Sequence, residues 1–283
     1  EREAAGGMLV RGALGLGIGL GFGLGIGVSN VILTGQPVDE FAEEEEVLSR
    51  EKGLKGNLGV LVTRLKPSPF RNVTDALIQL NTLTFALQKL SRGWLSAWGC
   101  KHNMAIASGQ LWRLFTPAFL HGNLIHLMVN CYSLNHIGPK TEAMFGSNRM
   151  LAIYMLSGIS GNLYSYYFNR LPAVGSSGAL FGLLGALGFF YYRHRKVLAK
   201  QVEQPLRSLR NVLVANLLIG LSTPNIDNWA HIGGVVAGAA TVMLLGPNLV
   251  IEDGAKGDSK ADRPFLVDKP PIPIFASKPL PLL

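Results

Sequence analysis

The chain has 283 residues, of which 48% are hydrophobic and only 16% are charged. Between residues 76 and 250 the only carboxylates are Glu142, Glu203 and Asp227, while uncharged stretches of membrane-spanning length recur. Water-soluble domains rarely separate their charges in this way, so we expect a polytopic membrane protein. The net charge of +8 comes from basic residues that bracket the apolar segments, so we expect contact with membrane lipid and no nucleic-acid partner.

The first two segments of the chain are predicted to lie outside the main membrane domain. Residues 1–38 form a glycine-rich hydrophobic segment that includes GLGIGLGFGLGIG at Gly15–Gly27. Its length suits a seventh membrane span, but its glycines disfavour a helix, so a span and a low-complexity remnant both stay open. Residues 39–72 form a polar arm that begins with an acidic cluster. The chain starts EREAAGG without a methionine, as a trimmed or incomplete sequence does, so its start does not serve to identify a targeting peptide.

Residues 73–250 are predicted to form an all-α membrane domain. Six uncharged or sparsely charged segments in it suit membrane helices, namely Val73–Ser91, Pro117–Pro139, Met150–Phe168, Ala173–Tyr192, Asn211–Ile226 and Trp229–Val250. The basic connection after Tyr192 indicates the inner side, and LSTPNIDN at 221–228, which lacks Lys and Arg, indicates the outer side. Residues 251–283 are charged and then proline-rich, and we expect them to form a solvated tail.

This topology places the first residues of three spans at the same outer face, among them Ser177 and His231. A serine hydroxyl becomes a nucleophile when a base accepts its proton, and histidine is suited to that task. Small residues four apart on both segments permit close helix contact and explain how the two side chains meet, namely Gly178 and Gly182 on one and Gly234 and Gly238 on the other. A helix-packing role is the alternative for an isolated serine, but an ionisable residue inside a span favours a functional site.

The second span adds polar residues at a similar depth in HGNLIHLMVN. His126 and Asn130 are four residues apart and share a helix face, from which their N–H groups can stabilise an oxyanion. The alternatives are an interhelical hydrogen bond for Asn130 and a capping or loop contact for His121. We interpret Asp227, just ahead of the last span, as a helix N-cap and not as the third member of a triad.

Other intramembrane chemistries fit the sequence less well. The spans hold no pair of aspartates and the chain has no HExxH motif, so we expect neither an aspartyl protease nor a zinc protease. We expect no metal and no cofactor. A small transporter would place charged or broken helices near the span centres, whereas the polar residues here gather toward one face.

In the order and spacing of its motifs, the chain resembles the rhomboid family of intramembrane serine proteases. The motifs are LWR at Leu111–Arg113, the trio His121, His126 and Asn130, GSSG at Gly175–Gly178, and AHIGGVVAG at Ala230–Gly238. The resemblance implies a six-helix core, a Ser177–His231 dyad, and an oxyanion site made of Asn130, His126 and the Ser177 backbone N–H. It also implies that His121 supports the site and that Phe181 stacks on His231.

The resemblance further implies the substrate class and suggests a compartment. Rhomboid proteases cleave peptide bonds in or next to the transmembrane helices of other membrane proteins, without a cofactor. The alternative is an inactive rhomboid-like protein that binds client helices for trafficking or turnover. The segment from Leu111 to Pro139 is most similar to plant plastid-type members, which implies a plastid inner membrane, with a mitochondrial inner membrane or a bacterial plasma membrane as alternatives.

Overall fold

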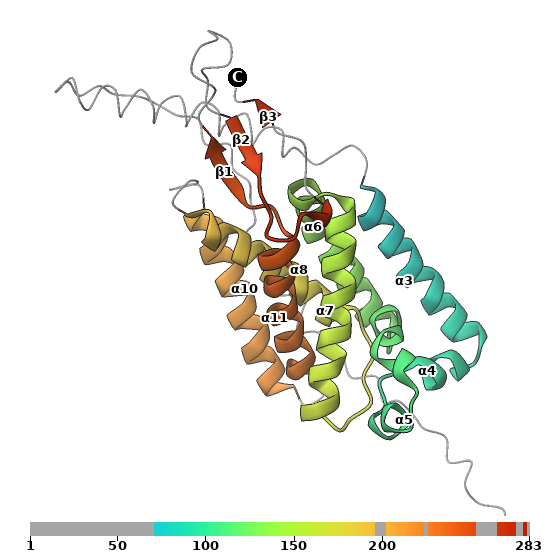
Figure 1. The fold of residues 1–283 in the computed structure, drawn as a ribbon. Helices are drawn as coiled ribbons and strands as arrows, with labels where there is room; N and C mark the ends of the chain where they lie inside the picture. The colour runs from blue at the N-terminus through green and yellow to red at the C-terminus, as the bar shows by residue number, and fades with distance from the viewer. Residues whose placement is uncertain (1–70, 196–201, 224–225, 253–264, 276–279, 282–283) are drawn as a thin grey trace, which may run out of the picture.

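The computed structural model describes residues 71–195, 202–223, 226–252, 265–275 and 280–281. It is a helical bundle with a small antiparallel sheet at one end (Figure 1). The long helices are α3 (Asn72–Leu90), α6 (Leu124–Phe145), α7 (Ser147–Phe168), α8 (Ser177–Arg193), α10 (Glu203–Ser222) and α11 (Asn228–Leu245). The glycine-rich segment 1–38 and almost all of the arm 39–72 lie outside the described residues.

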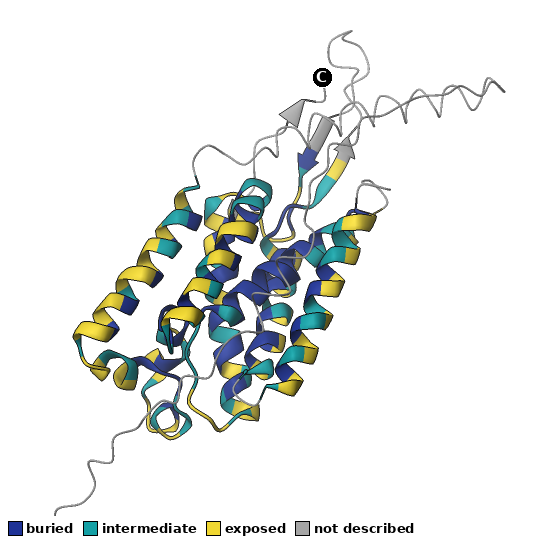
Figure 2. Ribbon diagram, turned by 180° about the vertical axis from the view of Figure 1, so that it is seen from behind, coloured by how far each residue is buried: buried dark blue, intermediate teal, exposed yellow. Residues whose placement is uncertain are grey.

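Helix α8 forms the centre of the bundle. Most of its side chains are buried, including Leu180, Leu183 and Leu187 (Figure 2). The outer helices instead expose large apolar side chains, among them Leu83 and Leu90 on α3 and Leu218 and Leu221 on α10. Buried polar groups and an exposed apolar surface are the distribution expected of a bundle whose solvent is lipid.

Helices α8 and α11 are in backbone contact through glycines. A methyl group placed on Gly234 would overlap the carbonyl oxygen of Gly178, and one placed on Gly238 would overlap that of Gly182. Helix α7 approaches in the same way, since a methyl group on Gly161 would lie 2.7 Å from the carbonyl oxygen of Ala230. Only glycine permits these separations, so the three helices form one closely packed unit.

Helix α6 differs from the span that the sequence predicted at Pro117–Pro139. Pro117 lies instead in the short 3₁₀ helix η2 (Thr116–Phe119), and α6 begins at Leu124 because the Asn123 side chain caps it by accepting a bond from the His126 N–H at 2.8 Å. The helix also continues past Pro139 and ends at Gly146, whose φ of +82° suits glycine.

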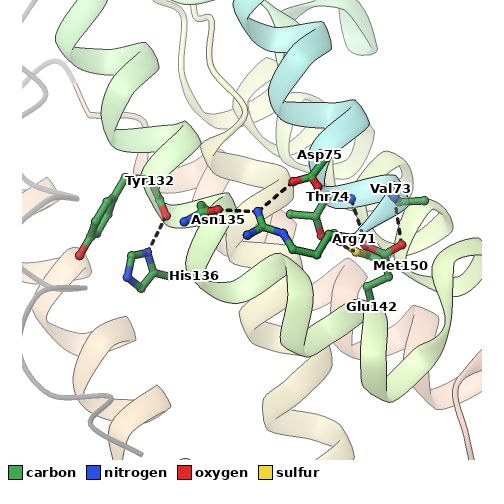
Figure 3. Close-up of polar contacts among 9 residues, drawn as sticks. All are labelled: Arg71, Val73, Thr74, Asp75, Tyr132, Asn135, His136, Glu142 and Met150. Atoms are coloured by element: carbon green, nitrogen blue, oxygen red, sulfur yellow. Dashed lines mark hydrogen bonds and ion pairs between the residues drawn. The ribbon is translucent and has the colours of Figure 1, made fainter. Parts of the chain in front are cut away.

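The buried carboxylate of Glu142 joins α3 to α6. It accepts hydrogen bonds from the backbone N–H groups of Val73 and Thr74, at 2.9 and 3.1 Å, and from the Thr74 hydroxyl at 2.9 Å (Figure 3). The Ser147 hydroxyl donates a fourth bond at 2.7 Å. A carboxylate at the N-terminus of α3 satisfies N–H groups that have no partner within the helix, so Glu142 fixes one end of α3 against α6.

The end of the chain departs from the solvated tail that we expected. Strand β1 (Leu249–Glu252) pairs with β2 (Phe265–Asp268), which pairs with the short β3 (Leu280–Pro281), and η4 (Pro273–Phe275) follows β2. Asp268 forms a largely buried ion pair with Arg149 of α7 at 2.8 Å, and His194 Nε2 accepts a bond from the Leu249 N–H at 3.0 Å. These contacts fix the hairpin to the ends of α7 and α8.

The protonation state of His194 follows from its surroundings. Its Nδ1 donates to the Phe190 carbonyl at 2.9 Å, which leaves Nε2 as the acceptor for Leu249. Burial lowers the pKa of His194, and the Arg193 guanidinium acts in the same direction. The neutral ring that the hairpin requires is therefore the favoured form near pH 7.

Two short helices, α4 (Trp94–Gly99) and α5 (Asn103–Ala107), and the 3₁₀ helix η1 (Leu111–Leu114) lie between α3 and α6. The sequence did not predict them. They lie at the end of the bundle opposite the hairpin (Figure 1). Among the described helices, α11 alone is long and apolar enough to cross a membrane by composition, so the count of six spans stays a prediction.

The glycine contacts predict opposite effects for two substitutions to alanine. Gly238→Ala forces a methyl group into the α8 backbone and is expected to lower the free energy of unfolding by about 1–3 kcal/mol or more. Gly188→Ala, on α8 itself, meets no atom within 4 Å and is expected to be neutral or to stabilise by about 0.5–1 kcal/mol. Unfolding in detergent micelles measures both, and equal effects would contradict the role of the contact.

Candidate functional site

Ser177 is the first residue of α8, at the opposite end of that helix from His194, which contacts the hairpin. The chain reaches it through Gly175, whose φ of +134° is a conformation that favours glycine and whose N–H donates to the Pro117 carbonyl at 2.9 Å. Ser177 is partly exposed, whereas the adjacent Ser176 is fully buried. The turn at Gly175 therefore leaves Ser177 as the accessible hydroxyl of the pair.

Ser177 and His231 are in contact across α8 and α11. The Ser177 Oγ lies 3.1 Å from His231 Nε2, which is hydrogen-bonding distance. His231 is in the first turn of α11 and is largely buried. The close approach of the two helices through their glycines is what brings these side chains together.

Phe181 lies one turn after Ser177 and stacks on the His231 ring. The ring centroids are 4.0 Å apart and the planes differ by 7°. A flat contact of this kind restricts rotation of the imidazole about its side-chain bonds. Phe181 therefore holds the His231 ring in the plane from which Nε2 reaches Ser177.

Asp227 caps α11 and does not act as a partner of the imidazole. Its Oδ1 accepts a bond from the Ala230 N–H at 3.2 Å, and its Oδ2 bonds the Ser165 hydroxyl of α7. His231 Nδ1 is buried without a hydrogen-bond partner in the described part of the chain. The N-cap interpretation of Asp227 is thus confirmed, and the serine and histidine form a pair without a carboxylate.

His126 lies against the turn that precedes Ser177. A methyl group placed on Gly175 would lie 2.7 Å from His126 Nε2 and 3.9 Å from Asn130 Nδ2. The Gly122 N–H points at His126 Nδ1 at 3.5 Å, an arrangement in which Nδ1 accepts and Nε2 carries the proton. The N–H edge of His126 and the amide of Asn130 therefore both face the Gly175 turn.

Asn130 is fully buried and only partly bonded. Its Nδ2 donates to the His126 carbonyl at 3.0 Å, and its Oδ1 has no partner among the described residues. An amide group has two N–H donors, so one remains for another acceptor. The first-turn N–H groups of α8, including that of Ser177, also have no acceptor within the helix.

His121 lies behind this group and contacts Ser176. Its Nε2 is 3.5 Å from the Ser176 Oγ, and its ring meets the His126 ring edge-on with centroids 5.3 Å apart. Gln88 of α3 holds the His121 backbone by accepting from its N–H at 3.0 Å and donating to its carbonyl at 3.1 Å. Gln88 was not predicted as a site residue, because its only signal in the sequence is that of a polar residue near the end of an apolar helix.

Arg113 of the LWR motif organises the segment between α4 and η1. Its guanidinium donates to the carbonyls of Ala97 and Cys100, both at 2.9 Å, and to the Gln110 side chain at 2.7 Å. It makes no contact with Ser177 or His231 in the structure. Its contacts instead fix the turns between α4 and η1.

Comparisons with known proteins identify the family. The family model described as Rhomboid domain matches residues 108–248. Rhomboid protease GluP of Bacillus subtilis is 38% identical over 178 residues, covering 61% of this chain and 34% of GluP. Putative rhomboid protease YdcA of the same organism is 34% identical over 139 residues, covering 48% of this chain and 68% of YdcA. Inactive RHOMBOID-like protein 8 of Arabidopsis thaliana is 36% identical over 129 residues, covering 45% of this chain and 36% of that protein.

Relatives named for two organelles also match. RHOMBOID-like protein 9, chloroplastic, is 30% identical over 157 residues, and RHOMBOID-like protein 6, mitochondrial, is 36% identical over 141 residues, both from Arabidopsis thaliana. The chain spans only about a third to a half of the length of most of these relatives. The matched segment includes Ser177, His231, Phe181, Asn130, His126 and His121, whereas Gln88 precedes it. The chain therefore belongs to the rhomboid family and is a polytopic helical membrane protein.

Proposed function

We propose that this chain is an intramembrane serine endopeptidase that hydrolyses peptide bonds in or next to the transmembrane helices of membrane-protein substrates. The observation that carries the proposal is the 3.1 Å contact between Ser177 Oγ and His231 Nε2, with the imidazole plane set by Phe181. Membership of a family that includes named proteases supports the reaction class.

The first half of the proposed reaction is acyl transfer. His231 Nε2 accepts the Ser177 proton while Oγ forms a bond to the scissile carbonyl carbon, which gives a tetrahedral oxyanion. The imidazolium then donates that proton to the leaving amine as the C–N bond breaks. Ser177 is left as an ester of the acyl fragment of the substrate.

The second half of the proposed reaction hydrolyses the ester and regenerates the free Ser177 hydroxyl. Neutral His231 takes a proton from a water molecule, the resulting hydroxide attacks the ester, and the proton returns to Ser177 Oγ as the C–O bond breaks. The partial exposure of Ser177 gives this water a route that the fully buried Ser176 lacks. No cofactor is needed for either half.

We assign the oxyanion site to three donors on two elements. The Ser177 backbone N–H points from the positive end of α8, and the His126 Nε2–H and the free Asn130 N–H face the adjacent turn. In enzymes with such sites, one preorganised donor contributes roughly 3–4 kcal/mol to lowering the barrier. We assign His121 a supporting role, because it contacts Ser176, the residue next to the Ser177 donor.

The membrane arrangement that accompanies this function has six spans, formed by α3, α6, α7, α8, α10 and α11. We propose that the Ser177 end faces the outer side, because the basic connection after α8 indicates the inner side.

For the compartment we propose a plastid inner membrane, because the Leu111–Pro139 segment is similar to plastid-type members. Fractionation of the tagged protein in its native cell tests this, and recovery in mitochondria or a bacterial membrane would contradict it.

A catalytically inactive protein that binds client helices is the competing function, and one relative is named as inactive. Such a protein has no need for a serine–histidine contact, a stacked aromatic ring or donors directed at the turn. The present chain has all three. Catalysis is therefore the better account of the geometry.

The dyad is tested with a serine-reactive fluorophosphonate and a generic transmembrane substrate in liposomes. The unmodified chain is expected to be labelled and to cleave the substrate, and Ser177→Ala is expected to do neither because the nucleophile is gone. His231→Ala is expected to lose cleavage, whereas Ser176→Ala is the matched control that leaves Ser177 labelling intact. Labelling that persists in Ser177→Ala would overturn the assignment of the nucleophile.

The absence of a third catalytic carboxylate is tested with Asp227→Asn. Asparagine caps a helix as well as aspartate does, so α11 is expected to stay in place. Turnover is expected to stay within a few-fold of the unmodified chain, whereas loss of a triad aspartate costs about 10⁴-fold in kcat. A fall of that size, with unchanged thermal stability, would show that Asp227 takes part in the chemistry.

A further inference from the structure

Lys101 is a charged residue in an unexpected place, because its side chain is fully buried. It lies between α4 and α5, in the segment that the sequence left without an assigned role. Placing an ammonium group out of contact with solvent is costly unless it is bonded, and a methionine fills similar space without that cost. The contacts of Lys101 therefore need an explanation beyond packing.

The ammonium of Lys101 binds the connection between α7 and α8. Nζ donates to the carbonyl oxygens of Asn169 and Leu171, at 2.5 and 2.9 Å. Asn169 is the C-cap of α7, and a cation at a helix C-terminus meets carbonyls that have no partner within the helix. This connection leads through Gly175 directly to Ser177.

The backbone of Lys101 binds the same connection. Its N–H donates to the Ala173 carbonyl at 2.9 Å, and its carbonyl accepts from the Ala173 N–H at 3.2 Å. Asn103 adds bonds from Nδ2 to the carbonyls of Tyr166 and Asn169, at 2.7 and 3.2 Å. The side chain and backbone of one residue thus fix three successive points of the chain before the Gly175 turn.

Two opposing effects act on the charge of Lys101. Burial lowers the pKa of Lys101, and attraction to the Asp227 carboxylate, the N-cap of α11, acts in the opposite direction. The hydrogen bonds of the ammonium place it at the connection between the end of α7 and the start of α8. The path of this connection sets where α8, and with it Ser177, begins.

We propose that Lys101 is a positioning residue for the reaction: its ammonium and backbone hold the 169–175 connection so that Ser177 Oγ, its backbone N–H and the Gly175 turn keep the geometry that catalysis requires. This inference rests on the proposed protease function. Its expected consequence is a change in the chemical step and not in substrate binding, because Lys101 is buried and has no surface to offer a substrate.

The test compares Lys101→Met with the unmodified chain in liposomes. Methionine keeps the volume and removes both Nζ bonds, and kcat is expected to fall by about 10- to 100-fold with KM within about threefold, the size of effect that a misplacement of about 1 Å produces. Lys89→Met, which removes an exposed lysine on α3, is the matched control and is expected to match the unmodified chain.

A second comparison separates positioning from general destabilisation. Glu142→Gln weakens the α3–α6 junction at the end of the bundle away from Ser177 and provides a destabilised reference. At a matched loss of thermal stability it is expected to keep its fluorophosphonate labelling rate, whereas Lys101→Met is expected to lose it. Asn103→Ala, a second variant should Lys101→Met not fold, is expected to lower the rate in the same direction by a smaller factor.

The outcomes distinguish this inference from the function on which it rests. If the unmodified chain is neither labelled nor active, the protease proposal fails. If the unmodified chain is active and Lys101→Met has the same kcat, or loses rate only in proportion to stability as Glu142→Gln does, the positioning role fails while the protease proposal stands.

Discussion

The backbone contact between α8 and α11 is the constraint on which the rest of the structure depends. Ser177 and His231 each lie in the first turn of their helix, so the separation of the helix axes decides whether the two side chains meet. That separation is set by Gly234 against Gly178 and by Gly238 against Gly182, where a single methyl group has no room. Close packing of small residues replaces the hydrophobic effect as the source of specificity between helices in lipid.

Around this contact, the polar groups of the site are held by parts of the chain that are distant in sequence. Gln88 of α3 fixes His121, the Gly175 turn meets His126 of α6, and Lys101 fixes the connection that leads into α8. At the other end of the bundle, Glu142 and the Arg149–Asp268 ion pair fix α3 and the hairpin. The contacts near Ser177 hold the donors in place before a substrate arrives, which is what an oxyanion site of preorganised donors requires.

Much of the site could be predicted from the sequence because its chemistry is local to three motifs. The pairing of Ser177 and His231 follows from the topology and from the small-residue spacing of two apolar segments, and the N-cap role of Asp227 follows from its position before a helix. The stacking of Phe181 on His231 follows only from the resemblance to the rhomboid family. The functions of Gln88 and Lys101 could not be predicted, since their partners are backbone carbonyls and N–H groups, which carry no sequence signal. The start of α6 was misplaced because the apolar run already begins at Pro117, whereas the helix begins at Leu124 after the Asn123 cap, and the Pro117 carbonyl accepts a tertiary bond from the Gly175 N–H.

The measurement that tests the central claim most directly is an experimental structure of the chain after reaction with a fluorophosphonate. The account predicts phosphorus bonded to Ser177 Oγ, with His231 still stacked on Phe181. It also predicts the phosphoryl oxygen within hydrogen-bonding distance of the Ser177 N–H and of the His126 or Asn130 side chain. An adduct on another residue, or α8 and α11 separated so that Ser177 and His231 do not meet, would contradict it.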